Sequence, residues 1–231
     1  MDTTINVGID ISIRSTGICI NHGDDLEFHV ISPTDSIVDK KGNYRKWFAA
    51  IQNMATFHQY QSIKSHTTQL ELLPMFNEIV DIIQRIFQDS NIYPHNCVIT
   101  IEDYSYTKNN TNSIIDLVTL STLIRNYLHL NQYTIKLVSP TQLKVFCGSI
   151  AYKKQLTKTK GKYTYRNKQN KAAGSFDKTD ILAAIVESDI PNTHPYIGFL
   201  REYYNPDIKS VVKPFDDLND AMLLSMYSLP K

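Results

Sequence analysis

The chemistry that this sequence could support begins with acidic residues placed inside or at the ends of apolar runs. Asp10 lies between two isoleucines in "VGIDI", and Glu102 ends the run "CVITIE". Asp217 and Asp220 are three residues apart in "DDLNDA", so one face of a helix would carry both. Two strand ends and one helix face would therefore present four carboxylates.

Such a cluster repels itself unless it is protonated or neutralised, and hard divalent cations prefer oxygen ligands of this kind. Two Mg²⁺ ions about 3.5–4 Å apart would suit phosphodiester hydrolysis, one activating the attacking water and the other stabilising the leaving oxygen. Taken singly, each acid has a plainer interpretation as a turn, a cap or a helix start, and the last of these suits Asp216, Asp217 and Asp220. Their joint order of strand, strand and final helix is what favours catalysis.

The surrounding pattern predicts the elements that would position these acids. Residues 4–11, 17–21 and 26–31 indicate an antiparallel meander, because "NHGDD" supplies turn chemistry. Apolar residues three and four apart predict a helix over 67–89, although Pro74 falls near its first turns. The order of elements indicates one α/β domain over residues 1–231. The remaining predicted elements are a helix near 44–57, a strand over 97–104, a helix over 112–130, a strand over 133–140, a short helix from Thr141 with Gly148 as C-cap, a helix over 175–188, a loop over 190–214 and a final helix from Asp216.

Taken in order, these motifs resemble the RuvC-type Holliday junction resolvases of the ribonuclease H-like superfamily. "GIDISIRSTG" (8–17) is similar to the first-strand motif of that family, and "TIEDYSYTKN" (100–109) resembles its second acidic strand. "VSPTQLKVFCG" (138–148) and "DDLNDA" (216–221) resemble the two later motifs. The resemblance spans residues 5–34, 67–148 and 175–228. It implies a ribonuclease H-like mixed sheet, with an antiparallel meander followed by parallel strands and flanked by helices.

The resemblance also implies a Mg²⁺-dependent endonuclease that cuts four-way DNA junctions as a homodimer, with two ions per site and Mn²⁺ able to substitute. Lys178 in "DKTDI" is similar to the family's lysine near the scissile phosphate, and Lys144 is a candidate for backbone contact. Asp217 is preferred to Asp216 because the family spacing is three residues followed by Ala. The implied metal ligands are Asp10, Glu102, Asp217 and Asp220.

The chain departs from the family pattern at three places, which bear on junction geometry and sequence preference more than on metal chemistry. The family carries an aromatic wedge after the strand-end Glu, and Tyr104 and Tyr106 are the two candidates here. An extra segment covers residues 36–65, and a basic insertion covers residues 149–174. The helix over 112–130 is a candidate interface element of the implied dimer.

The basic insertion gathers positive charge in one place. Residues 151–175 contain seven lysines, one arginine and no acid, whereas the rest of the chain has 16 basic residues against 23 acidic ones. Phosphate contacts would give sequence-independent affinity for nucleic acid, and the interleaved tyrosines could stack on bases. A solvated loop is the alternative interpretation. The candidate DNA-binding cations are Lys153, Lys154, Lys158, Lys160, Lys162, Arg166, Lys168 and Lys171.

Composition narrows the class of protein. A hydrophobic content of 42% and a charged content of 20% are typical of a globular protein, and no apolar run is long enough for a membrane span. The first residues, "MDTTINVGID", include no basic n-region, so we expect no signal peptide. Cys19, Cys97 and Cys147 are widely spaced, which predicts buried thiols in a reducing, intracellular compartment. The abundance of Ile, Asn, Lys and Tyr is compatible with a virus or phage.

Four functions remain open at this point. The first is a four-way-junction resolvase, and the second is a nuclease of the same fold that acts on flap or other branched DNA, or on RNA. The third is an actin-like or sugar kinase ATPase, whose first strand is similar, but the chain lacks the second Asp-x-Gly phosphate motif. The fourth is a nucleic-acid-binding module without catalysis, which would have no use for clustered acids.

Overall fold

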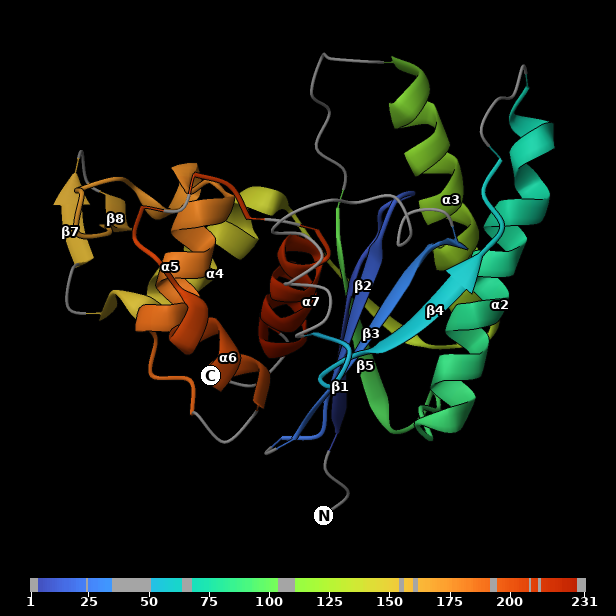
Figure 1. Cartoon of the computed structure of the whole chain (residues 1–231), viewed down its shortest axis with the longest axis horizontal. Helices are drawn as coiled ribbons and strands as arrows, with labels where there is room; N and C mark the ends of the chain where they lie inside the picture. Colours follow the sequence, from blue (N-terminus) through green and yellow to red (C-terminus); the bar gives the residue numbers. More distant parts are fainter. Residues whose placement is uncertain are drawn as a thin grey trace.

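The fold is organised around one six-stranded mixed sheet (Figure 1). In this computed structural model the strand order is β4-β3-β2-β1-β5-β6. Strands β1, β2 and β3 are antiparallel, whereas β5 runs parallel to β1, β6 parallel to β5, and β4 parallel to β3. The predicted mixed sheet, an antiparallel meander followed by parallel strands, is therefore confirmed. The structure describes residues 4–23, 25–34, 51–63, 68–103, 111–153, 156–159, 162–191, 195–207, 209–211 and 213–227.

The elements follow the predicted order closely. The strands are β1 Ile5–Asp10, β2 Thr16–Asn21, β3 Leu26–Pro33, β4 Thr56–Tyr60, β5 Cys97–Glu102, β6 Thr134–Val138, β7 Leu156–Thr159 and β8 Lys162–Tyr165. The helices are η2 Gln69–Leu72, α2 Leu73–Asp89, α3 Thr111–Leu130, α4 Pro140–Ala151, η4 Ala173–Ser175, α5 Lys178–Glu187, α6 Pro195–Tyr203 and α7 Phe215–Tyr227.

The two faces of the sheet are covered by different helices. Helices α2 and α3 pack on one face, and α7 packs on the other, with α4, α5 and α6 beyond it (Figure 1). Because side chains alternate along a strand, Val7 and Ile9 enter the core under α2 and α3, whereas Gly8 and Asp10 face α7. The acid in the first strand is thus directed to the α7 face by the same alternation that buries its neighbours.

Helix α7 approaches the sheet closely because two glycines leave room for it. A Cβ atom on Gly8 would lie 1.9 Å from the carbonyl oxygen of Ala221, and one on Gly17 would lie 2.5 Å from that of Asp217. No real Cβ tolerates such distances to backbone atoms. These glycines let the backbone of α7 rest on β1 and β2, which sets the position of the acids that the helix carries.

Several predicted elements are corrected by the structure. Residues 56–60 form an edge strand parallel to β3, not the end of a helix, and the part of that predicted helix before residue 51 lies outside the described residues. Residues 195–203, predicted as loop, form α6. Gly148 does not cap α4 but lies inside it, where a Cβ would be 2.4 Å from that of Ala173. Pro74 does not interrupt α2, because it occupies the first turn, where a helix needs no backbone N–H donor.

The three cysteines agree with a further expectation. Cys19, Cys97 and Cys147 are all buried free thiols, and burial raises the pKa of Cys97 to about 11 and that of Cys19 to about 12. Within the described ranges, the search for a helix of sufficient length and apolar character to cross a bilayer found none.

Candidate functional site

Asp10 and Glu102 lie side by side at the carboxyl ends of two neighbouring parallel strands. The register pairs Ile9 of β1 with Ile101 of β5, so the next residue of each strand points to the α7 face. Asp10 is buried, with 8% of its surface exposed, and Glu102 is half-buried. The carboxyl end of a sheet is where chemistry is commonly placed in α/β folds.

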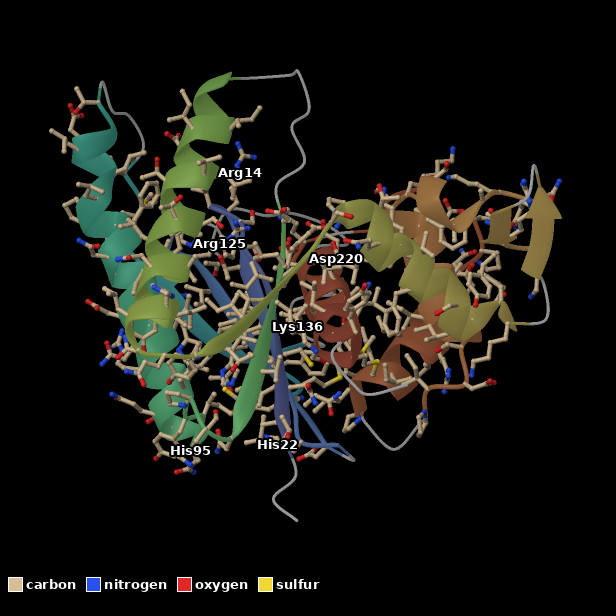
Figure 2. The ribbon with its side chains drawn as sticks, turned by 180° about the vertical axis from the view of Figure 1, so that it is seen from behind. Arg14, His22, His95, Arg125, Lys136 and Asp220 are labelled. Atoms are coloured by element: carbon tan, nitrogen blue, oxygen red, sulfur yellow. The ribbon has the colours of Figure 1, made fainter. Side chains whose placement is uncertain are left out.

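Helix α7 brings the other two acids to the same place. Asp217 and Asp220 are both almost fully buried, at 2% and 3% exposure. The backbone of Asp217 lies against Gly17, which is the register partner of Asp10, so α7 places this acid beside the end of β1. Figure 2 shows Asp220 on α7, toward the end of the sheet away from His22 and His95. The choice of Asp217 over its half-buried neighbour Asp216 agrees with this burial.

The electrostatics show that the four carboxylates converge. Burial, followed by repulsion from Asp220, Asp217 and Glu102, raises the pKa of Asp10 well above its ordinary value. Burial and then Asp220 raise the pKa of Glu102 to about 7. The pKa of Asp217 rises to about 6, mainly through burial. A cluster whose members each resist ionisation is one that would gain from a bound cation.

Two lysines provide part of the missing positive charge. Lys178, the first residue of α5, donates from Nζ to Asp220 Oδ2. Lys213, on the loop before α7, donates to Asp217 Oδ1 at 2.6 Å and lies 3.4 Å from Ser12 Oγ. Lys178 was expected from the sequence. Lys213 was missed, and the only available signal was its place four residues before Asp217.

The carboxylate oxygens that the two lysines do not contact are suited to bind a hard divalent cation. Asp217 Oδ2 and Asp220 Oδ1 are buried without a hydrogen-bond partner, an arrangement that costs free energy unless something binds there. Asp10 and Glu102 would supply further carboxylate oxygens from the strand ends. Across the described ranges, no three acidic, histidine or cysteine side chains already form a closed metal-binding group. A bound ion would therefore have to draw these carboxylates inward.

A pocket opens beside two of the four carboxylates, Glu102 and Asp220. Its volume is about 290 Å³, and α4, α5, α7 and the end of β5 line it. Lys144 and Lys178 stand in its wall beside Glu102 and Asp220, so two cations flank the acids where a phosphate would arrive. Lys144, a weaker candidate in the sequence, is thus placed at the site. The other lining residues include Pro140, Leu143, Asp177 and Ile181.

The end of β5 is fixed by a residue that the sequence did not reveal. Arg125 of α3 donates from Nη2 to the Glu102 carbonyl oxygen and to Asp103 Oδ1, both at 3.3 Å. This guanidinium holds the strand end from the α3 face and so positions Glu102 from behind. Tyr104 and Tyr106, the two wedge candidates, lie outside the described residues.

The basic insertion contains a two-stranded hairpin as well as loop. In β7 and β8, Lys158 pairs in register with Tyr163, and Lys162 with Thr159. Four other candidate cations are engaged within the protein. Lys153 lies 3.9 Å from Asp189, Arg166 donates to the Asn170 carbonyl, Lys168 contacts Glu187 at 2.9 Å, and Lys171 contacts Asp177 at 2.7 Å. Lys154 and Lys160 lie outside the described residues.

Raising the pH should destabilise the metal-free protein through Glu102. Its pKa of about 7, against 4.5 for an ordinary Glu, means that the folded state binds more protons than the unfolded state between these values. Stability is therefore lost as the pH rises from 4.5 to 7, by about 3 kcal/mol in order of magnitude. Glu102→Gln should flatten this part of the profile, measured by thermal unfolding in a chelator from pH 4 to pH 8.

The matched control for this experiment is Asp81→Asn, which changes an exposed acid on α2. It should keep the wild-type dependence on pH. If Glu102→Gln and the wild type lose stability in parallel as the pH rises, Glu102 is not held in the charge-repelling environment described.

Comparisons with known proteins found matches among solved structures. No protein-family model matches the sequence, and no curated protein matches it either. Among solved structures, T. thermophilus RuvC in complex with Holliday junction substrate is 8% identical with a TM-score of 0.46, over 96% of this chain and 90% of that chain. A second Thermus thermophilus RuvC structure is 10% identical with a TM-score of 0.41, over 96% and 92%.

Proposed function

We propose that this protein is a divalent-metal-dependent endonuclease that cuts branched DNA, with the four-way junction as its substrate. The observation that carries the proposal is the convergence of Asp10, Glu102, Asp217 and Asp220 at one end of the sheet, beside an open pocket flanked by lysines. A binding surface for phosphates would not gather buried acids, because they repel the ligand. Phosphodiester hydrolysis with a bound cation gives them a use.

Each residue of the site has a role that its position supports. The four carboxylates would hold the metal, which when bound supplies an activated water and stabilises charge on the phosphate. Lys178 and Lys144, on the pocket wall, would bind and orient the phosphate to be cut. Arg125, which holds the carbonyl of Glu102, would act as a positioning residue. Leu143 and Ile181 form an apolar part of the wall.

The deciding experiment is cleavage of a labelled four-way junction in Mg²⁺, with linear duplex, flap and single-stranded DNA alongside. Paired symmetric nicks on the junction alone are expected. Cutting of flaps in preference to junctions would keep the metal site and change the substrate. Junction binding without cleavage, in Mg²⁺ and in Mn²⁺, would contradict the proposal and favour a binding module.

The hairpin of the basic insertion is proposed to bind DNA backbone outside the pocket. The variant Lys158→Gln, Lys160→Gln, Lys162→Gln should weaken junction binding and reduce the slope of log affinity against log salt by about 2 to 3, since each phosphate contact contributes about 0.9. Fluorescence anisotropy over a salt series measures this. Arg85→Gln, Lys136→Gln, Lys209→Gln removes the same charge from exposed positions elsewhere and should leave the slope in place. An unchanged slope in the hairpin variant would exclude the contact.

A homodimer follows from the same proposal, because two symmetric cuts require two sites. Helix α3 is the interface candidate, and Ile115 on it is 43% exposed although apolar. Analytical ultracentrifugation of the wild type beside Ile115→Asp tests this. Loss of the dimer in the variant is expected, and an unchanged dimer would place the interface elsewhere.

A further inference from the structure

Lys213 is placed in the carboxylate centre without belonging to any of the motifs that predicted the centre. Its Nζ lies 2.6 Å from Asp217 Oδ1, and its side chain is 37% exposed against 3% for that of Asp217. Burial alone would lower the pKa of Lys213, but the carboxylates of Asp217, Asp216 and Asp10 together outweigh this and raise it. The ammonium group is therefore a resident positive charge on the Asp217 side of the centre.

The two aspartates of α7 are paired in the same way. Asp220 accepts a hydrogen bond from Lys178 on Oδ2, and its Oδ1 is buried without a hydrogen-bond partner. Asp217 accepts a hydrogen bond from Lys213 on Oδ1, and its Oδ2 is buried without a hydrogen-bond partner. Each lysine thus neutralises one oxygen of an aspartate and leaves the other available. A divalent ion that bound Asp217 through both oxygens, or through Oδ1, would have to displace the lysine first.

The charges in the centre leave room for one divalent ion. Five carboxylates and three ammonium groups interact there among the described residues, which leaves two negative charges when all are ionised. One divalent cation would balance them, and a second would leave a buried positive excess that low-dielectric surroundings disfavour. The groups are Asp10, Glu102, Asp216, Asp217 and Asp220 on the acidic side, and Lys144, Lys178 and Lys213 on the basic side.

The two lysines differ in how firmly they are held. Lys178 begins α5, whose N-cap Asp177 accepts from the backbone N–H groups of Thr179 and Asp180, and this ties its backbone in place. Lys213 lies on the loop before α7, and its ammonium contacts only Asp217 and Ser12 in the part of the chain that the structure describes. Substituting Lys213 should consequently alter metal binding with less effect on the fold than substituting Lys178.

We propose that Lys213 occupies one of the two cation positions of the centre, so that the DNA-free protein binds one divalent ion where two would otherwise bind. The inference rests on the proposed metal-dependent function and adds a residue that sets its metal content. A lysine ammonium is a compact point charge, so it can stand beside a carboxylate where an ion would stand. An ammonium group cannot activate a water molecule as a metal ion does. The DNA-free centre would therefore hold one metal ion that can do so.

The experiment measures Mn²⁺ bound per chain, by calorimetry and by the loss of the free-ion electron paramagnetic resonance signal. The wild type is expected to bind about one ion, and Lys213→Met about two, because the variant frees Asp217 Oδ1 and lowers the positive excess that a second ion would create from two charges to one. Lys213→Arg keeps the charge and should bind about one ion. Lys209→Met, a change of the same kind at an exposed position four residues earlier, should also stay at one.

Thermal unfolding supplies a second readout that does not depend on cleavage. Without metal, Lys213→Met leaves Asp217 without its cation and should unfold at a lower temperature than the wild type. Saturating Mn²⁺ should raise the unfolding temperature of this variant by more than it raises that of the wild type, because a second ion binds only to its folded state.

Two ions bound to the wild type, or one bound to Lys213→Met, would overturn the inference. If either is found while the wild type still cuts junctions in Mg²⁺, only the role of Lys213 is wrong. If neither wild type nor variant binds Mn²⁺, the metal-dependent function is wrong as well, and the inference falls with it.

Discussion

Asp220→Asn should lower junction cleavage by at least about a thousandfold and leave junction binding within about twofold of the wild type. Asp220 is nearly fully buried, contacts Lys178, and keeps one oxygen free for a metal. An amide has no charge to hold the ion, and a loss of about 4 kcal/mol of transition-state stabilisation corresponds to a thousandfold in rate. Single-turnover cleavage of a labelled junction measures the rate, and anisotropy measures binding.

This loss can be separated from misfolding. Burial raises the pKa of Asp220, so its ionised form destabilises the metal-free folded state as the pH rises above the ordinary pKa of an aspartate. Asparagine removes that penalty, and the variant should unfold at pH 8 in chelator no earlier than the wild type. Asp81→Asn, an exposed acid on α2, should retain full activity. Wild-type cleavage by Asp220→Asn would mean that the carboxylate centre is not the active site.

Gly8→Ala should be the most destabilising single substitution of a small residue in the sheet, by at least about 3 kcal/mol. The added methyl group would stand 1.9 Å from the carbonyl oxygen of Ala221 and 2.5 Å from the amide nitrogen of Ser225. Both are backbone atoms of α7, so the helix and β1 must separate. Asp10 belongs to one and Asp220 to the other, and their separation would also open the candidate active site.

Gly198→Ala is the matched control, since it adds the same methyl group to the helix α6 and meets no atom within 4 Å. It should raise stability by about 0.5–1 kcal/mol, the difference in helix propensity between the two residues. Urea unfolding compares both variants with the wild type. If Gly8→Ala unfolds at the wild-type midpoint, α7 does not rest on β1 as described.

The strands and the convergence of acids could be predicted because they depend on local patterns. Alternation along β1 directs Gly8 and Asp10 to one face of the sheet. The spacing of Asp217 and Asp220 puts both on one side of α7, the helix that packs on that face. The antiparallel pairing of β1, β2 and β3 follows from the turn residues between β2 and β3 and from the short connections. For this reason the sequence alone was enough to propose that the four carboxylates lie at one end of the sheet, and their role as metal ligands stays a prediction.

The features that were not predicted depend on contacts between segments far apart in the sequence. Strand β4 has only five residues, and the predicted helix near 44–57 overlaps just its first two; the strand was not predicted because its identity comes from pairing with β3. Lys213 and Arg125 have no local signature, since their roles come from what tertiary packing places beside them. Residues 195–203 were predicted as loop because of the prolines around them, although Pro195 suits the first position of α6.

The attachment of the basic insertion restricts how the chain can be shortened. Lys171 contacts Asp177 and Asp180, and Asn167 donates to Asp180 Oδ1 at 3.1 Å. These two acids form the capping box of α5, so the base of the insertion is bonded to the helix start that presents Lys178. A deletion of residues 149–174 as a block would remove both anchors, whereas trimming only the tip of the hairpin would keep them. Natural or engineered variants should therefore differ in hairpin length far more readily than in residues 166–180.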